Sequence, residues 1–164
     1  MQAPKVFKSA FDHFTDERGY LNPISSRVVT DLLGQDTFKP VFQLTSLSTE
    51  KHTFRGLHYQ CDPFRQTKLL IVHSGQLIDY IVPFEDPSLG KMQRFELCAG
   101  DVMLIPNSFA HGFLTKTENV LLQYLLDEEF DDESYRGISA SNIPELRENE
   151  RKIRISEKDQ AYSE

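Results

Sequence analysis

Short apolar runs alternate with turn residues through the middle of the chain, from Pro40 to residue 126. The runs have the length of β-strands, and several alternate apolar and polar residues with a period of two. Turn signals such as Ser74-Gly75 and Pro106-Asn107 separate most of them. The pattern predicts strands at residues 41–48, 54–60, 67–73, 76–83, 92–98, 102–105, 109–115 and 119–126.

The two flanks of this region have a different pattern. Residues 1–24 are predicted to be extended, with a turn at 16–19. A short helix is predicted from Ser25 to Leu33, because apolar residues recur there at helical spacing and Gly34 follows. The acidic segment 127–136 and the mixed-charge tail from Glu145 are predicted to wrap the outside, with one helical turn near 144–151.

Many short strands separated by turns predict an all-β protein, a jelly roll or related barrel with one or two short helices. The chain has 164 residues, which is the length of one ordinary domain, so we expect residues 1–164 to form a single unit.

Composition narrows the possible partners and the compartment. The net charge of −7 argues against general binding to nucleic acid, and the apolar runs are too short to span a bilayer, so we expect no membrane partner. The two cysteines, Cys61 and Cys98, have no CxxC spacing, and the N-terminus has no signal-peptide pattern. We therefore expect a cytoplasmic protein.

Ionisable residues interrupt the apolar strands. Because residues two apart in a strand share a face, His58 is predicted to lie with Phe54 and Gln60, and His111 with Phe109 and Phe113. Each such residue alone could be a core residue whose hydrogen bonds are satisfied by the backbone. On separate strands of one small barrel, however, they must approach one another, which predicts a polar cavity. The residues concerned are His58, Lys68, Asp79, His111 and Tyr124.

A metal centre is one alternative for this cavity, since barrel sites with two histidines and a carboxylate commonly bind iron, zinc or manganese. Here the second histidine of a His-x-His pair is replaced by Gln60, and Lys68 places a competing cation nearby. We therefore predict no metal and no other cofactor.

Several motifs together resemble one known family, the nucleoside-diphosphate 4-keto sugar epimerases typified by dTDP-4-dehydrorhamnose 3,5-epimerase. The resemblance covers nearly the whole chain and is specific as a set, in order and spacing. The motifs are Asp-Glu-Arg-Gly at 16–19, Arg-Gly-Leu-His-Tyr-Gln at 55–60, Gln-Thr-Lys-Leu at 66–69, Ala-His-Gly-Phe at 110–113, Tyr124, Arg-Gly-Ile at 136–138 and Ser-Glu-Lys-Asp at 156–159.

The resemblance implies a cupin-like jelly roll, usually a homodimer with exchanged N-terminal strands, and assigns catalytic roles. It implies that His58 is the general base and that Asp159 orients and polarises it. It also implies that Tyr124 is the general acid, that Lys68 lies beside the sugar ketone, and that His111 belongs to the same pocket.

The resemblance also implies how a nucleotide-sugar substrate is bound. Arg18 and Arg55 match phosphate-contacting arginines, Gln43 matches a nucleotide-contacting glutamine, and Lys158 matches a binding lysine. Phe130 falls where an aromatic ring stacks on the nucleobase. Some nucleotide-side positions depart from the family pattern, namely Pro23, Leu44, Thr45 and Tyr135, which leaves the nucleobase open.

The implied activity is epimerisation of a nucleotide-linked 4-keto-6-deoxy sugar at C3, C5 or both, with dTDP-4-dehydro-6-deoxyglucose as the first candidate substrate. A 3,4-ketoisomerase on the same scaffold is one alternative, and a non-catalytic sugar-nucleotide binding protein is another. The presence of both a base, His58, and an acid, Tyr124, favours the epimerase.

Overall fold

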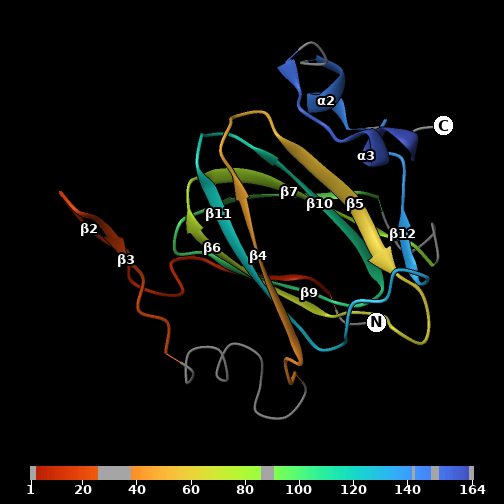
Figure 1. Ribbon diagram of the computed structural model, residues 1–164, viewed down its shortest axis with the longest axis horizontal. Helices are drawn as coiled ribbons and strands as arrows, with labels where there is room; N and C mark the ends of the chain where they lie inside the picture. The colour runs from red at the N-terminus through yellow and green to blue at the C-terminus, as the bar shows by residue number, and fades with distance from the viewer. Residues whose placement is uncertain (1–2, 26–37, 86–90, 142, 149–151, 163–164) are drawn as a thin grey trace.

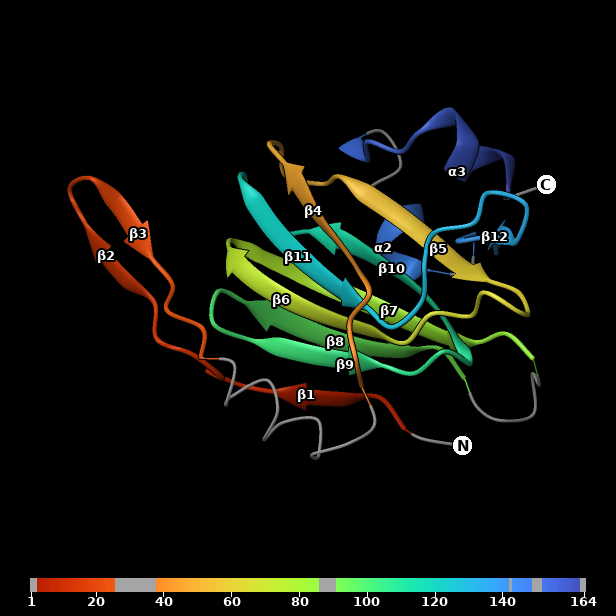
Figure 2. The same cartoon turned by 60° about the horizontal axis from the view of Figure 1, so that its bottom comes forward.

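The strands of the computed structural model form two facing sheets, with a separate hairpin beside them (Figure 1 and Figure 2). The structure describes residues 3–25, 38–85, 91–141, 143–148 and 152–162. Within these residues all neighbouring strands of the two sheets pair antiparallel. The first sheet has the order β1 (Lys5–Phe7), β9 (Val102–Ile105), β6 (Lys68–Ser74), β11 (Val120–Leu126) and β4 (Phe42–Ser48). The second has the order β12 (Tyr135–Gly137), β5 (Phe54–Gln60), β10 (Phe109–Thr115), β7 (Gln76–Pro83) and β8 (Gln93–Cys98).

This architecture confirms the predicted all-β, cupin-like fold. The eight strands predicted from 41 to 126 are all present, and each observed boundary lies within one residue of the prediction. The alternation of apolar runs and turn residues was sufficient to locate them because each strand is short and turn residues separate most of them.

The main core lies between the two sheets and is built from their inward-facing residues. It contains Leu70 and Val72 of β6, Leu77 and Ile81 of β7, Phe109 and Phe113 of β10, and Leu122 and Leu126 of β11, among others. These residues share faces with Lys68, Asp79, His111 and Tyr124, each of which is at least 91% buried. The two-residue period of the strands grouped these four polar side chains with their apolar neighbours, and the structure shows that the shared face points into the interior.

Apolar residues also cover the outer faces of both sheets. The outside of the second sheet, including Phe54, Leu57 and Tyr80, packs against Ile143 and the C-terminal segment. That segment carries two short helices, α2 (Pro144–Glu148) and α3 (Glu157–Ala161). The first corresponds to the helical turn predicted near 144–151, whereas α3 was not predicted. The predicted helix of 25–33 lies outside the described residues, apart from Ser25.

The turn predicted at 16–19 joins β2 (Phe14–Asp16) to β3 (Gly19–Leu21), and this hairpin extends away from the sheets (Figure 1 and Figure 2). Its apolar side chains are exposed: Phe14 by 57%, Tyr20 by 45% and Leu21 by 68%. In a single chain this hairpin therefore leaves apolar surface uncovered. No helix among the described residues is long and apolar enough to cross a membrane.

Candidate active site

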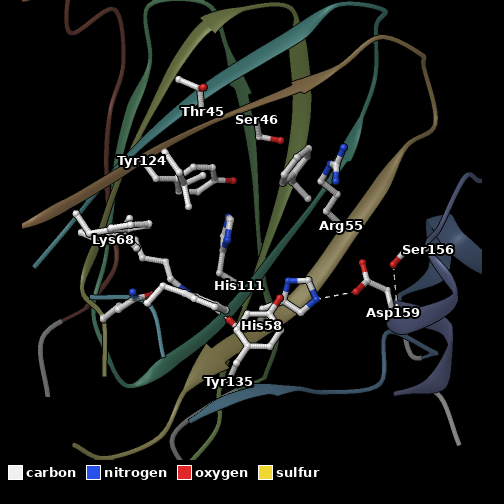
Figure 3. A pocket seen from close by; sticks show the side chains of 16 residues that line it. Thr45, Ser46, Arg55, His58, Lys68, His111, Tyr124, Tyr135, Ser156 and Asp159 are labelled. Atoms are coloured by element: carbon white, nitrogen blue, oxygen red, sulfur yellow. Dashed lines mark hydrogen bonds and ion pairs between the residues drawn. The ribbon is translucent and has the colours of Figure 1, made fainter. Parts of the chain in front are cut away.

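A cavity of about 440 Å³ lies between the sheets and is closed on one side by the C-terminal tail (Figure 3). Its walls combine several cationic and hydrogen-bonding groups with aromatic and aliphatic side chains, the composition typical of a small-molecule site. The lining residues are Phe42, Leu44, Thr45, Ser46, Arg55, His58, Gln66, Lys68, His111, Phe113, Tyr124, Leu126, Phe130, Tyr135, Ser156 and Asp159.

An irregularity in β5 directs two of its side chains into this cavity. Opposite β10 the register shifts, since His111 pairs with His58 whereas Phe113 pairs with Arg55. Gly56 lies within the shift at a φ of +123°, and a Cβ on it would overlap Gly112. Arg55 and His58 consequently both line the cavity although they are three residues apart.

The same irregularity corrects one prediction. His58 was predicted to share its face with Phe54, but Phe54 packs in the outer core with Leu57 while His58 faces the cavity. The rule that residues two apart in a strand share a face was wrong here, because the bulged residues change the side-chain alternation along the strand.

His58 forms a close pair with Asp159 of α3. The Asp159 Oδ1 atom lies 2.7 Å from His58 Nε2, and Oδ2 accepts the Gly56 N–H at 3.3 Å. The Asp159 N–H in turn donates to the side chain of Ser156, the N-cap of α3, at 3.1 Å. Burial opposes ionisation of this carboxyl, but its hydrogen bonds, led by that to His58, outweigh burial and lower the pKa of Asp159. An ionised Asp159 accepts the Nε2–H of His58, which leaves the Nδ1 lone pair of the neutral ring to accept a proton.

A second group of buried ionisable residues consists of Lys68 and His111, which line the cavity, and Asp79 behind them. The Asp79 Oδ2 atom is 2.6 Å from His111 Nε2, while Oδ1 of the same carboxyl has no hydrogen-bond partner. Burial raises the pKa of Asp79, against the opposing effects of His111 and Lys68. Desolvation lowers the pKa of Lys68 to about 8, although Asp79 favours its charged form. At neutral pH the Lys68 amine is thus mainly an ammonium in a poorly solvated site.

Tyr124 enters the cavity from β11, in the sheet opposite to that of His58. Figure 3 shows its hydroxyl directed toward the middle of the cavity. The ring is edge-on to the imidazole of His111, with centroids 5.8 Å apart. Burial, reinforced by the negative charge of Asp79, raises the pKa of Tyr124 well above its usual value. Its hydroxyl therefore stays protonated and can act as a donor.

The aromatic rings of Tyr135 and Phe130 line the cavity beside His58. The ring of Tyr135 lies 5.0 Å from that of His58 and 5.6 Å from that of Phe130. The Lys158 ammonium sits 4.3 Å from the centre of the Tyr135 ring, in cation–π contact. Phe130 is half exposed, so its ring is accessible to a planar group from solvent.

Seven of the predicted site residues line the cavity: His58, Tyr124, Asp159, Lys68, Arg55, His111 and Phe130. The remaining three do not. Arg18 lies on the β2–β3 hairpin, exposed and paired with Asp16. Gln43 does not line the cavity, and its Oε1 accepts from Gln123 at 3.4 Å. Lys158 contacts the ring of Tyr135 outside the cavity lining.

Some cavity residues were not predicted. Ser156 could have been found, because Ser-x-x-Asp at 156–159 has the spacing of a helix N-terminus. Tyr135 was noted only as a departure from a motif, and Thr45 likewise. Gln66, which donates to the backbone of Glu128 and Glu129, belonged to a quoted motif without an assigned role.

Two facing antiparallel sheets around a cavity that contains the His58–Asp159 pair define a cupin-like barrel protein with an internal small-molecule site. A family model described as dTDP-4-dehydrorhamnose 3,5-epimerase matches residues 1–164. The chain therefore belongs to the dTDP-4-dehydrorhamnose 3,5-epimerase family.

Curated relatives and solved structures agree with this assignment. The chain is 36% identical over 97 residues to a dTDP-4-dehydrorhamnose 3,5-epimerase of Sinorhizobium fredii. This match covers 57% of the chain and 50% of the relative, so the chain spans about half of that protein's length. It is 29% identical over 130 residues to the Shigella flexneri enzyme of the same name, covering 76% and 71%.

Among solved structures, the chain is similar to the Bacillus anthracis dTDP-4-dehydrorhamnose 3,5-epimerase with TDP and PPi bound. The TM-score is 0.75 and the sequence identity is 29%, and the match covers 96% of this chain and 91% of that one. A Legionella pneumophila epimerase in complex with dTDP-4-keto-L-rhamnose is similar with a TM-score of 0.73, at 26% identity, covering 97% and 91%.

Proposed function

We propose that this protein is an isomerase that epimerises a nucleotide-linked 4-keto-6-deoxy hexose at C3, C5 or both. The first candidate substrate is dTDP-4-dehydro-6-deoxyglucose, because the similar solved structures contain TDP and a dTDP-4-keto sugar. The observation that carries the proposal is the opposed arrangement of the cavity. The His58–Asp159 pair belongs to one wall, and the protonated hydroxyl of Tyr124 projects from the other.

The proposed reaction begins with removal of a proton from a carbon next to the ketone. Such a C–H bond is acidic because the resulting carbanion delocalises onto the ketone oxygen as an enolate. His58 accepts this proton at Nδ1, and the imidazolium that forms is stabilised by the anionic Asp159 at 2.7 Å. The reaction needs no change of oxidation state, so we propose that it proceeds without a redox cofactor, and we propose that the Lys68 ammonium takes the place that a metal ion would have at the enolate oxygen.

The enolate oxygen then requires positive charge or hydrogen-bond donors. Lys68 supplies an ammonium in a desolvated part of the cavity, where it stabilises a developing negative charge more strongly than it could in water. His111, bonded to Asp79, provides a second polar group in the same region. The proton is returned on the opposite face of the sugar by Tyr124, which inverts the carbon.

The nucleotide part of the substrate is proposed to bind at the outer end of the cavity. The guanidinium fork of Arg55 suits a diphosphate, and the exposed ring of Phe130 suits stacking on a base. Gln43, Lys158 and Arg18 are proposed to contribute further contacts, the last from a neighbouring subunit.

We propose that the protein is a homodimer with exchanged N-terminal strands. The β2–β3 hairpin exposes three large apolar side chains, and β4, an edge strand, exposes Leu44 by 40% and Leu47 by 54%. Pairing of a partner's hairpin with this edge buries both surfaces and brings Arg18 toward the partner's cavity.

Cys61 and Cys98 are free thiols, which accords with the proposed cytoplasmic location.

The dimer is tested with Leu21→Asp, which places a carboxylate on the exposed hairpin. We expect sedimentation to show a shift from dimer to monomer, and we expect KM for the nucleotide sugar to rise because Arg18 no longer reaches it. Asn107→Asp adds the same charge at an exposed turn of the barrel and is expected to remain dimeric. A wild-type protein that sediments as a monomer at all concentrations contradicts the exchange.

The activity is tested by incubating the protein with dTDP-4-keto-6-deoxyglucose in D₂O. We expect deuterium to enter at C3, C5 or both, followed by inversion, as seen by NMR. Migration of the carbonyl to C3 would instead identify a 3,4-ketoisomerase. Binding without exchange would identify a sugar-nucleotide binding protein.

A further inference from the structure

Gly137 lies directly opposite the proposed base. In the ladder between β12 and β5, Gly137 is the partner of His58. The space that a side chain on Gly137 would fill is occupied by the aromatic ring of Tyr162, and an added Cβ would overlap three atoms of that ring. The absence of a side chain at this position therefore lets the Tyr162 ring approach the backbone beside His58.

Tyr162 is the C-cap of α3, the helix that carries Asp159. Its ring is also edge-on to the imidazole of His58, with centroids 6.1 Å apart and planes at 71°. The last described residue of the tail thus contacts both strands of the ladder at the position where Asp159 reaches His58.

We propose that Gly137 and Tyr162 are positioning residues that hold α3 against β5 and β12, so that Asp159 stays in hydrogen-bonding contact with His58. This inference rests on the proposed function for its catalytic consequence. Its geometric part, the docking of α3, can be tested without substrate.

The short length of α3 is the reason why it needs such an anchor. The helix has five residues, and an isolated helix of that length is unstable in water. The Ser156 cap fixes the beginning of the helix by accepting from the Asp159 N–H, but it does not attach the helix to the sheet. The contacts that do so are the Asp159 carboxylate, the Lys158 ammonium on the ring of Tyr135, and the ring of Tyr162 on Gly137.

A small displacement of α3 has a large effect on the pair. The His58–Asp159 distance is 2.7 Å, and a shift of about 1 Å takes it beyond the range of a hydrogen bond. The imidazole then loses both the group that fixes its tautomer and the charge that stabilises its protonated form. Binding of the nucleotide through Arg55 and Phe130 does not depend on this contact.

The kinetic test compares Tyr162→Ala, Tyr162→Phe and Gly137→Ala. We expect Tyr162→Ala and Gly137→Ala to lower kcat by about 10- to 100-fold with KM changed less than threefold, since misplacement by about 1 Å can cost that much. Tyr162→Phe keeps the ring and should restore kcat to within twofold of the wild type. Tyr59→Ala is the matched control, because Tyr59 lies on β5 beside His58 but stacks outward on Phe84 at 4.0 Å. It should leave kcat within twofold.

A double-mutant cycle separates positioning from general destabilisation. If Tyr162 acts through Asp159, adding Tyr162→Ala to Asp159→Ala should lower kcat by less than twofold further. A further loss of tenfold would show that Tyr162 acts independently of Asp159 and would overturn the proposal.

Hydrogen exchange tests docking whether or not the protein is an epimerase. The N–H groups of Asp159 and Gln160 are bonded within α3 to Ser156, and we expect their exchange to become at least tenfold faster in Tyr162→Ala and Gly137→Ala, with the barrel strands unchanged. Unchanged exchange in both variants refutes the positioning role. A wild-type protein inert toward the 4-keto sugar refutes the proposed function alone, since the exchange result still decides the docking.

Discussion

His58→Asn is expected to abolish solvent exchange at C3 and C5 of the 4-keto sugar, with a loss of at least about 10³-fold, while nucleotide affinity is preserved. Asparagine is close in size to histidine and its amide can still donate to Asp159, so the wall of the cavity is kept. It has no lone pair that can take a proton at neutral pH. The measurement is deuterium incorporation by NMR, with dTDP affinity determined by calorimetry.

Asp159→Asn is the companion variant. The amide removes the negative charge that stabilises the imidazolium but leaves the base in place, so we expect a smaller loss, about 10²-fold. If His58→Asn retained exchange within tenfold of the wild type, another group would have to be the base. An equal collapse of dTDP affinity in either variant would point to a disturbed cavity rather than to a lost base.

The two-residue period of the strands was sufficient to predict which side chains share a face, but not which face points into the barrel, because the opposite faces of several strands are also largely apolar. Lys68, Asp79, His111 and Tyr124 all enter the space between the sheets with the apolar neighbours that parity assigned to them. Each lies on a strand with leucine, isoleucine, valine or phenylalanine two positions away, which predicted a shared face but left its orientation to the fold.

The position of His58 could not be predicted in the same way. Its orientation depends on the register shift around Gly56, where two glycines on adjacent strands pack backbone against backbone. A periodic rule has no information about a bulge, and the glycines are visible in the sequence only as possible irregularities. The contact partners of the bulge, 50 residues apart or more, are a property of the folded chain.

The tail shows a different limit. Asp159 reaches His58 across a sequence separation of 101 residues, and only the family motif suggested this pairing. The helix that carries it has too few residues to show a hydrophobic period. Arg18 and Gln43 mark a third limit, since their proposed contacts require a second subunit and a bound nucleotide, which a single chain does not contain.

The second large effect is expected at Lys68. Lys68→Met keeps the length of the side chain but removes the ammonium, and we expect kcat to fall by about 10²- to 10³-fold because the enolate loses its nearest positive charge. The wild-type enzyme should also lose activity as the pH rises through about 8, because burial lowers the pKa of Lys68 to about 8 and the neutral amine cannot stabilise the enolate. The measurement is kcat/KM against pH, which reports the free enzyme.

The groups around Lys68 determine the direction of this fall in kcat/KM near pH 8, the alkaline limb of the pH profile. Desolvation disfavours the ammonium and moves its loss to lower pH, whereas Asp79 partly opposes this. Tyr124 cannot produce the limb, because burial and Asp79 both raise the pKa of its hydroxyl.

Lys68→Arg tests whether Lys68 produces the limb. A guanidinium remains charged at every accessible pH, so the limb near pH 8 should disappear even though the bulkier group lowers the maximal rate. If the limb stays near pH 8 in Lys68→Arg, another group controls it and the assignment of Lys68 to the enolate oxygen is wrong.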